Sequence, residues 1–223
     1  MDRPPKEASV SAELTGKREI KQERAARTRA QIARAAAEVF AENGFAGASV
    51  TKITQRAGLT LGAMYFHFES KEALAREIVR SQPERVAPLH EAEGLQRAVD
   101  ITLTWAHRLL DDPFLLAGAR LVMEQESFID PEENSHRQWT EVIADSLVLA
   151  QREREVRAGV EVETVSRLIV NACTGAQMHA HLESGRQDLP QRVREIWNVL
   201  LPVIATPSAL KRLSLDSSRW RAA

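Results

Sequence analysis

The sequence contains a single cysteine, Cys173, among its 223 residues. One thiol forms no disulfide within the chain and no multi-thiolate metal site, which suits a reducing compartment. We interpret Cys173 as a small buried apolar side chain, with a redox sensor as the alternative. We expect neither a metal ion nor a cofactor.

Enzyme signatures are also missing. The chain contains no G-x-S-x-G, no phosphate-binding G-x-x-x-x-G-K-[ST], no G-x-G-x-x-G and no H-E-x-x-H. The nearest histidine pair, His179 and His181, is two residues apart, so the rings would leave a helix on different faces and would not share a metal. We predict that the protein is not an enzyme.

Long hydrophobic runs are absent. The longest, near residues 199–205, is interrupted by Pro202 and is too short to cross a bilayer. Residues 1–20 are polar and lack the apolar segment of a signal peptide. We expect a cytoplasmic protein with no membrane association, in which residues 1–20 form a flexible arm.

Aromatic residues make up only 5% of the chain, and no long stretch alternates apolar and polar residues as a strand does. Alanine- and leucine-rich stretches instead carry apolar residues at helical spacing, and 43% of all residues are hydrophobic. These features predict an all-α fold with a sizeable core.

Residues 49–71 predict two short helices joined by a tight turn. Ile53 and Ala57 give the first helix an apolar face, Gly58 ends that helix, and Thr60 can cap the next one. This arrangement is typical of a helix-turn-helix, a structure that places its second helix in the major groove of DNA.

The second of these helices has two faces. Ala63, Met64 and Phe66 would pack it against the first helix. Its outward face would carry side chains that can reach phosphates or base edges, namely Thr60, Leu61, Tyr65 and His67. An ordinary helical hairpin with solvated polar residues is the alternative.

Helical patterns flank this motif on both sides. Upstream, apolar residues from Ile32 to Phe40 share one face, and Asn43-Gly44 would end their helix; downstream, Ser70 would cap a helix that includes Leu74 and Ile78. Residues 1–85 carry 15 Lys/Arg against 11 Asp/Glu, whereas the remaining residues carry 15 against 20. The pattern predicts a three-helix DNA-binding head over residues 21–82, with the positive charge on the part that meets DNA.

A larger helical body is predicted for residues 83–210, followed by a C-terminal tail, residues 211–223. Its helix over residues 162–182 carries a seam of mostly small side chains, which are Ile169, Ala172, Cys173, Ala176 and Ala180. Paired across a two-fold axis with the helix over residues 191–204, this seam would form a four-helix dimer interface. Packing within one chain is the alternative, but because readers of this type bind two half-sites, we favour a homodimer on a pseudo-palindromic operator.

The opposite face of the 162–182 helix mixes polar and apolar residues, namely Val170, Thr174, Gln177, Met178 and His181. A buried hydroxyl or amide without a partner costs roughly 1–3 kcal/mol. A small-molecule ligand could supply the partner. Alternatively, Thr174 bonds to its own helix and Gln177 faces solvent.

The run from Thr28 to Val79, with Y-x-H-F at residues 65–68, resembles the N-terminal domain of TetR-type repressors. The resemblance implies that the start of the recognition helix faces the major groove and that a tyrosine, a histidine and a lysine contact phosphates. The DNA-binding residues predicted on this basis are Arg29, Thr51, Lys52, Thr60, Leu61, Gly62, Ala63, Tyr65, His67 and Lys71. Related receptors usually have lysine at the position of Leu61, so one cationic contact is missing here.

Three further segments, DPFLLAGARLV (112–122), NACTGAQ (171–177) and SGRQDLPQRVREIWNVLLPVIATP (184–207), are similar to the regulatory domain of γ-butyrolactone receptors. That TetR branch controls secondary metabolism in filamentous actinobacteria. The resemblance implies a pocket wall at Trp139 and polar ligand contacts from Gln82 and Thr174. The ligand-binding residues predicted here are Gln82, Phe114, Leu121, Val122, Trp139, Ile143, Val170, Thr174, Gln177 and Met178.

Three functions follow as hypotheses. The first is a repressor released from DNA by a γ-butyrolactone-type signal, and the second is a pseudo-receptor of the same branch that senses an antibiotic or another end product. The third is a ligand-independent helical DNA-binding or partner-binding protein. Thr174, Gln177 and Trp139 together favour the first two, and the sequence does not separate those.

Overall fold

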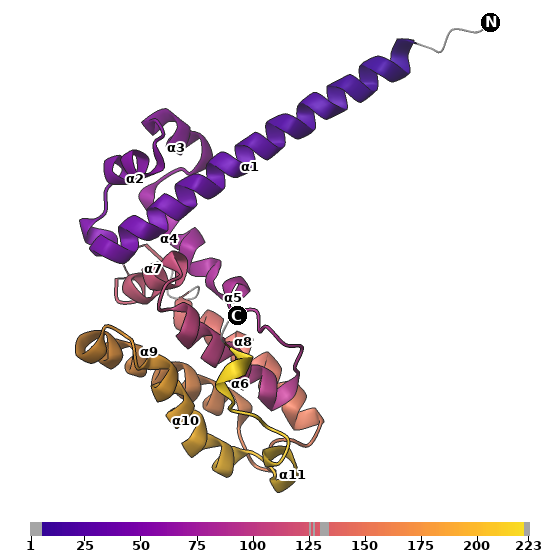
Figure 1. The fold of residues 1–223 in the computed structure, drawn as a ribbon, viewed down its shortest axis with the longest axis vertical. Coiled ribbons are helices and arrows are strands. Elements are labelled where there is room, and N and C mark those ends of the chain that lie inside the picture. Colours follow the sequence, from indigo (N-terminus) through magenta and orange to yellow (C-terminus); the bar gives the residue numbers. More distant parts are fainter. Residues whose placement is uncertain (1–5, 125, 127, 130–133, 221–223) are drawn as a thin grey trace, which may run out of the picture.

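A computed structural model describes residues 6–124, 126, 128–129 and 134–220 (Figure 1). Within these residues the chain is helical, and its β-structure is limited to one isolated antiparallel bridge between Val156 and Ala205. The prediction of an all-α fold is confirmed. Among the helices described, none has both the length and the apolar character that a membrane span requires.

The head contains α1 (Lys6–Gly47), α2 (Val50–Ala57), α3 (Leu61–His67) and α4 (Lys71–Arg80). Local residues set its helix ends as predicted. Gly58 ends α2 in the left-handed conformation, with φ of 64°, and the Thr60 hydroxyl accepts a hydrogen bond from the backbone N–H of Ala63 at 3.2 Å. The Ser70 hydroxyl caps α4 in the same way. The caps at Gly58 and Thr60 fix the turn between α2 and α3.

The N-terminal helix differs from the expected flexible arm. Residues 6–20 are helical and belong to α1, which projects away from the other helices (Figure 1). This stretch contains no proline and is rich in Glu, Lys and Ala, which have high helix propensity. At the other end of α1, Gly44 has φ of 69°, so the helix breaks at the predicted Asn43-Gly44 position.

The body contains α5 (Gln82–Arg85), α6 (Gly94–Arg108), α7 (Pro113–Leu121), α8 (Ser135–Arg152), α9 (Val162–Ser184), α10 (Leu189–Ile204) and α11 (Pro207–Leu210), with a final 3-10 turn at Ser217–Arg219. In the centre, α6 packs against α8 and α10, and α9 packs against both of these helices. Trp197 of α10 is fully buried, and its indole N–H donates to the Thr102 hydroxyl of α6 at 2.7 Å. The body therefore has a core of its own.

Helix α7 joins the body to the head. Of all pairs of described helices, α7 and α1 have the most extensive contact. Phe114 and Leu121 of α7 belong to the hydrophobic core of the head. Beyond α7, the Glu124 carboxylate accepts hydrogen bonds from the backbone N–H groups of Phe45 and Ala46, at 3.1 and 2.9 Å. The head core is thus completed by the body, whereas the sequence predicted three helices around a core of their own.

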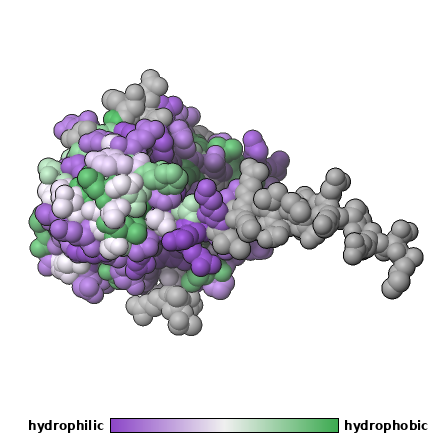
Figure 2. Space-filling model, turned by 90° about the horizontal axis from the view of Figure 1, so that it is seen from above, coloured by the Kyte–Doolittle hydropathy of each residue, from purple (hydrophilic) through white to green (hydrophobic). Residues whose placement is uncertain are grey.

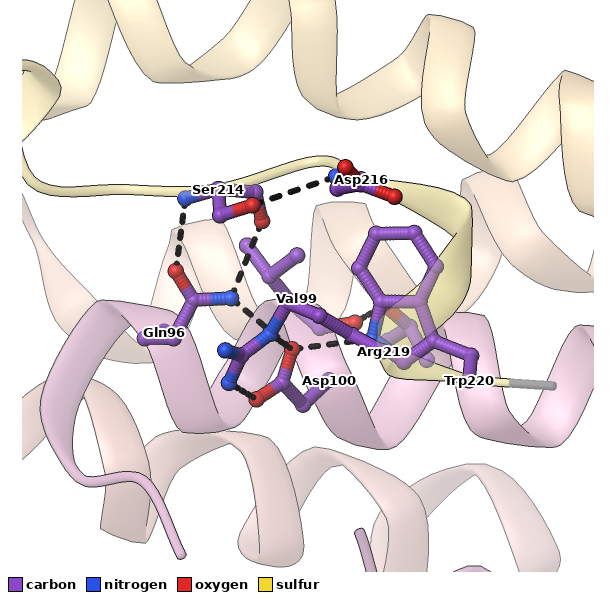
Figure 3. A network of polar contacts seen from close by, with 8 residues as sticks. Gln96, Val99, Asp100, Ser214, Asp216, Arg219 and Trp220 are labelled. Atoms are coloured by element: carbon purple, nitrogen blue, oxygen red, sulfur yellow. Dashed lines mark hydrogen bonds and ion pairs between the residues drawn. The ribbon is translucent and has the colours of Figure 1, made fainter. Parts of the chain in front are cut away.

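The C-terminal segment is fastened to α6 by Asp100, a carboxylate with only 1% exposure. Asp100 accepts hydrogen bonds from the Arg219 guanidinium at 2.7 Å, from the Trp220 indole at 2.9 Å and from the Gln96 amide at 2.8 Å (Figure 3). Gln96 also pairs with both backbone groups of Ser214. These hydrogen bonds satisfy the buried carboxylate and hold the C-terminal segment against α6.

The predicted dimer seam lies inside a single chain. Ile169, Cys173 and Ala180 are buried, as are Val193 and Trp197 on α10, so the expectation that this seam forms the dimer interface is wrong. A second apolar stripe is exposed instead, consisting of Leu168, Met178 and Leu182 on α9 and of Val199 and Val203 on α10. Both helices carry apolar residues on two sides, and periodicity alone does not tell which side faces the core.

Candidate functional site

The first candidate site is the exposed surface of α2 and α3. Leu61 and Tyr65 are each 51% exposed, and Thr51, Thr60 and Gly62 are also exposed. Figure 2 views the molecule from above, the side on which α2 and α3 lie, and shows hydrophobic patches among hydrophilic ones. The predicted outward face of α3 is therefore accessible to a large partner.

Phe66 corrects one prediction about α3. It was expected to pack inward but is 80% exposed, with its ring edge-on to His67 at 5.0 Å between centroids. Met64 and Phe68, four residues apart, supply the buried contacts instead. In a helix of seven residues one face alone can reach the core, and Phe66 lies on the opposite side from Met64.

The cationic side chains predicted to bind DNA have partners inside the head. The Lys71 ammonium donates to the carbonyls of Phe45 and Ala48, and the Lys52 ammonium donates to Asn43 and the Gly47 carbonyl. A lysine has three donors, so each retains one for another acceptor.

Arg29 is held more firmly. Its guanidinium forms a two-pronged ion pair with Glu77 and lies 4.4 Å above the Phe68 ring. The hydrogen bonds to Glu77 raise the pKa of Arg29. A phosphate would have to compete with Glu77 for Arg29, whereas Tyr65 and His67 are engaged in no such pair. The DNA-contacting roles stay predictions.

The second candidate site is a cavity within the body. It is lined by residues of α5 to α9 together with Val122. It brings together seven of the predicted ligand residues, which are Gln82, Val122, Trp139, Ile143, Val170, Thr174 and Gln177. These residues span almost one hundred positions of the sequence and meet only in the folded chain.

Three predicted ligand residues lie elsewhere. Phe114 and Leu121 occupy the side of α7 that packs into the head core, while Gly118 and Ala119 on the adjacent side line the cavity. Each residue of a helix is rotated by about 100° from the one before it, so residues that are adjacent in sequence face different surroundings. Met178 is 38% exposed in the apolar stripe of α9.

Nine residues of the cavity lining were not predicted to bind ligand, namely Ile101, Thr102, Trp105, Gly118, Ala119, Ser135, His136, Ile169 and Cys173. Most residues of α6 are buried, so the sequence pattern of this helix does not show which side faces the cavity, and Ile101, Thr102 and Trp105 could not be assigned to it. Ile169 and Cys173 had been placed in the dimer seam. A signal for His136 existed, since it lies three residues before Trp139 and shares its face of α8.

The polar groups of the cavity are neutral. Burial lowers the pKa of His136 and raises the pKa of the Cys173 thiol to about 12, so both are uncharged near neutral pH. The described lining contains no carboxylate, lysine or arginine. This chemistry suits an uncharged ligand that is mostly apolar, and it makes Cys173 a poor redox sensor because little thiolate forms.

Hydrogen bonding in the lining is incomplete. The Thr174 hydroxyl is 3.3 Å from His136 Nε2, and the Gln177 carbonyl oxygen accepts from Arg186 Nε at 3.3 Å. Gln82, by contrast, is 3% exposed, and its Nε2 has no hydrogen-bond partner among the described residues. A buried donor of this kind is a place where a ligand oxygen gains a hydrogen bond that the free protein lacks.

The walls of the cavity are connected to the head at two places, the end of α4 and helix α7. Gln82 follows the last residue of α4 by two positions, and the Gln138 amide, next to Trp139, donates to the Arg80 carbonyl at the end of α4 at 2.9 Å. Helix α7 forms cavity wall on one side and head core on the other.

In the described residues no cluster of three or more His, Cys, Asp or Glu side chains could hold a metal ion.

Comparisons with known proteins agree with this division. Residues 32–78 match the family described as bacterial regulatory proteins of the tetR family, and residues 92–205 match the tetracyclin repressor-like C-terminal domain. The chain belongs to the TetR family of regulatory proteins.

Individual relatives point to one part of the family. The A-factor receptor protein of Streptomyces griseus is 36% identical over 193 residues, which cover 86% of this chain and 69% of that protein. The crystal structure of full-length native TylP, a TetR regulator from Streptomyces fradiae, superposes with a TM-score of 0.81 at 35% identity and covers 88% of this chain and 95% of TylP. A γ-butyrolactone receptor described as ArpA-like superposes with a TM-score of 0.63 at 26% identity, over 85% of this chain and 93% of the receptor.

Proposed function

We propose that this protein is a transcriptional repressor that acts in the cytoplasm, binds operator DNA as a homodimer and is released by a small molecule of the γ-butyrolactone or related furan or butenolide type. Its targets would be genes of secondary metabolism. The observation that carries the proposal is the cavity with the unpartnered Gln82 amide in its wall, two residues beyond the last helix of the DNA-binding head.

The lining fits a lactone with an alkyl chain. Trp139 offers a flat wall, and Val122, Ile143 and Val170 offer apolar surface for the chain. Gln82 and Thr174 can donate hydrogen bonds to ring oxygens. With no charge in the lining, a neutral ligand loses little on desolvation.

The exposed apolar stripe of α9 and α10 supports a homodimer. Val199 and Val203 are 70% and 66% exposed, and Leu182 is 82% exposed, which is unusual for three aliphatic residues on adjacent helices. A second copy related by a two-fold axis would cover the same stripe on both chains. Replacing Val199 with Arg should convert the dimer to a monomer in sedimentation experiments, with helical content retained.

Coupling between ligand and DNA follows from shared elements. A ligand that moves helix α5 or α7 as a whole changes the position of α4 and of the head core, and therefore the separation of the two heads in a dimer. Ligand and DNA then favour different states, and each weakens the binding of the other.

The test begins with selection of the operator from random duplexes by the purified protein. Gel shifts with that operator are then repeated in the presence of synthetic γ-butyrolactones, and of extracts whose active component is identified by mass spectrometry. Release by lactones supports the proposal. Release by an antibiotic or other end product alone would make the protein a pseudo-receptor, and a failure of every extract and lactone to release it would favour a ligand-independent regulator.

A further inference from the structure

Gly118 occupies an unusual place in α7. It is buried in the wall of the cavity, in the middle of a nine-residue helix, and its backbone is not in the left-handed region. Glycine in the interior of a helix makes the helix less stable than alanine would, so helix formation does not explain a glycine at this position. The reason lies in its neighbour.

The neighbour is the side chain of Gln82. A Cβ atom built on Gly118 would lie 1.9 Å from Gln82 Nε2, 2.2 Å from Cδ and 2.4 Å from Oε1. All three distances are far below van der Waals contact, so the whole carboxamide lies against the bare backbone of α7. No methyl group fits between Gly118 and this amide.

Gln82 cannot yield by moving into solvent. It is 3% exposed, and the space beside it is the cavity lined by Trp105, Trp139 and Thr174. A side chain at position 118 would push the carboxamide into that space. There it would take up room needed by a ligand.

We propose that Gly118 sets the capacity of the ligand site, because its missing side chain lets the Gln82 carboxamide lie against α7 rather than in the cavity. This inference rests on the proposed function of the cavity. Gly118 acts through Gln82 and is therefore a positioning residue. A side chain at this position yields a repressor that still binds its operator but is no longer released at ordinary ligand concentrations.

The experiment compares the wild type with Gly118→Ala, Gln82→Ala and the double variant, all as full-length protein. The readout is the concentration of a synthetic alkyl γ-butyrolactone that releases half of the operator complex. For Gly118→Ala this concentration should rise at least about tenfold, the order of effect of one misplaced methylene in an apolar pocket, with operator affinity unchanged. In the Gln82→Ala background the same change should alter it by less than about twofold, because the contact is gone.

Two results would overturn the inference. One is a Gly118→Ala protein that responds to the lactone as the wild type does. The other is an equal loss of response in the Gln82→Ala background, which would mean that the methyl group acts on the ligand or the fold without Gln82.

A ligand-free measurement separates this inference from the proposed function. If the wild type itself does not respond to lactones, the proposed ligand class is wrong, and the crystal structure of Gly118→Ala decides about Gly118. A carboxamide displaced into the cavity supports the inference, and an unmoved carboxamide with a shifted α7 contradicts it. Should Gly118→Ala fail to fold, recovery of folding in the double variant supports the contact and continued misfolding refutes it.

Discussion

The head and the body of this protein differ in how far apart in the sequence the residues of their proposed binding sites lie. Apart from Arg29, the residues proposed to read DNA lie within residues 51–71, and each helix end there is set by a residue next to it, such as Gly58 or Thr60. The cavity is lined by residues between Gln82 and Gln177, on the five helices α5 to α9 and at Val122 directly after α7. DNA reading therefore depends on a short local motif, whereas ligand binding depends on how distant helices pack.

The two regions are nevertheless one mechanical unit. Phe114 and Leu121 of the body fill the head core, and Glu124 holds the backbone at the end of α1. Changes in the head surface should alter DNA binding alone, while changes in the cavity should alter the response to ligand, which reaches the head through α7 and α4. The variants below test this asymmetry.

Asp100→Ala should have the largest effect. It removes a buried carboxylate and leaves the Arg219 guanidinium and the Trp220 indole without their acceptor. Breaking a buried, hydrogen-bonded ion pair should lower the free energy of unfolding by roughly 3 kcal/mol, less than for a fully buried pair because Arg219 is partly exposed.

Urea denaturation followed by circular dichroism measures this loss. Asp111→Ala, at an exposed aspartate after α6, is the control and should change stability by less than about 0.5 kcal/mol. Equal stability of both variants would show that the C-terminal segment contributes nothing to the body.

Trp139→Ala should come next, and its effect should fall on the ligand. Because Trp139 is only half-buried and borders the cavity, the change removes aromatic surface from the ligand site more than from the core. We expect the ligand to lose about 2–3 kcal/mol of affinity while operator binding persists. Trp139→Phe, which keeps a flat wall, should recover part of the response in operator-release assays. A Trp139→Ala protein that responds normally would remove Trp139 from the site.

Tyr65→Ala and His67→Ala should affect the head alone. If these side chains bind phosphates, each change should weaken binding to the operator and to random duplexes by a similar factor, about tenfold. Gel-shift titrations on both kinds of DNA measure this, and thermal melts check the fold. Unchanged affinity in both variants would exclude this face of α3 from the DNA interface.

Leu61→Lys should have the smallest effect and the opposite sign. Leu61 is 51% exposed at the start of α3, on the face proposed to meet DNA. One added phosphate contact should steepen the log–log dependence of the binding constant on salt concentration by about 0.9 and raise affinity modestly. An unchanged slope would place residue 61 away from the DNA backbone.

How much the sequence could predict differs between the two regions for a physical reason. The caps at Gly58, Thr60 and Ser70 depend on adjacent residues and were predicted correctly. The side of α9 that faces the core could not be read from its sequence, because Ile169 and Leu168 are both apolar and tertiary packing alone buries the first and exposes the second. The contact between Gly118 and Gln82 joins two helices that no local pattern connects.

Coupling between the cavity and the DNA surface can be measured as the difference in ligand affinity with and without operator. The quenching of tryptophan fluorescence by a releasing lactone can report binding, since Trp105 and Trp139 line the cavity. Saturating operator should weaken lactone binding by the same factor by which saturating lactone weakens operator binding, because coupling free energy is reciprocal. A lactone affinity that operator leaves unchanged would show that the cavity and the DNA surface are not coupled.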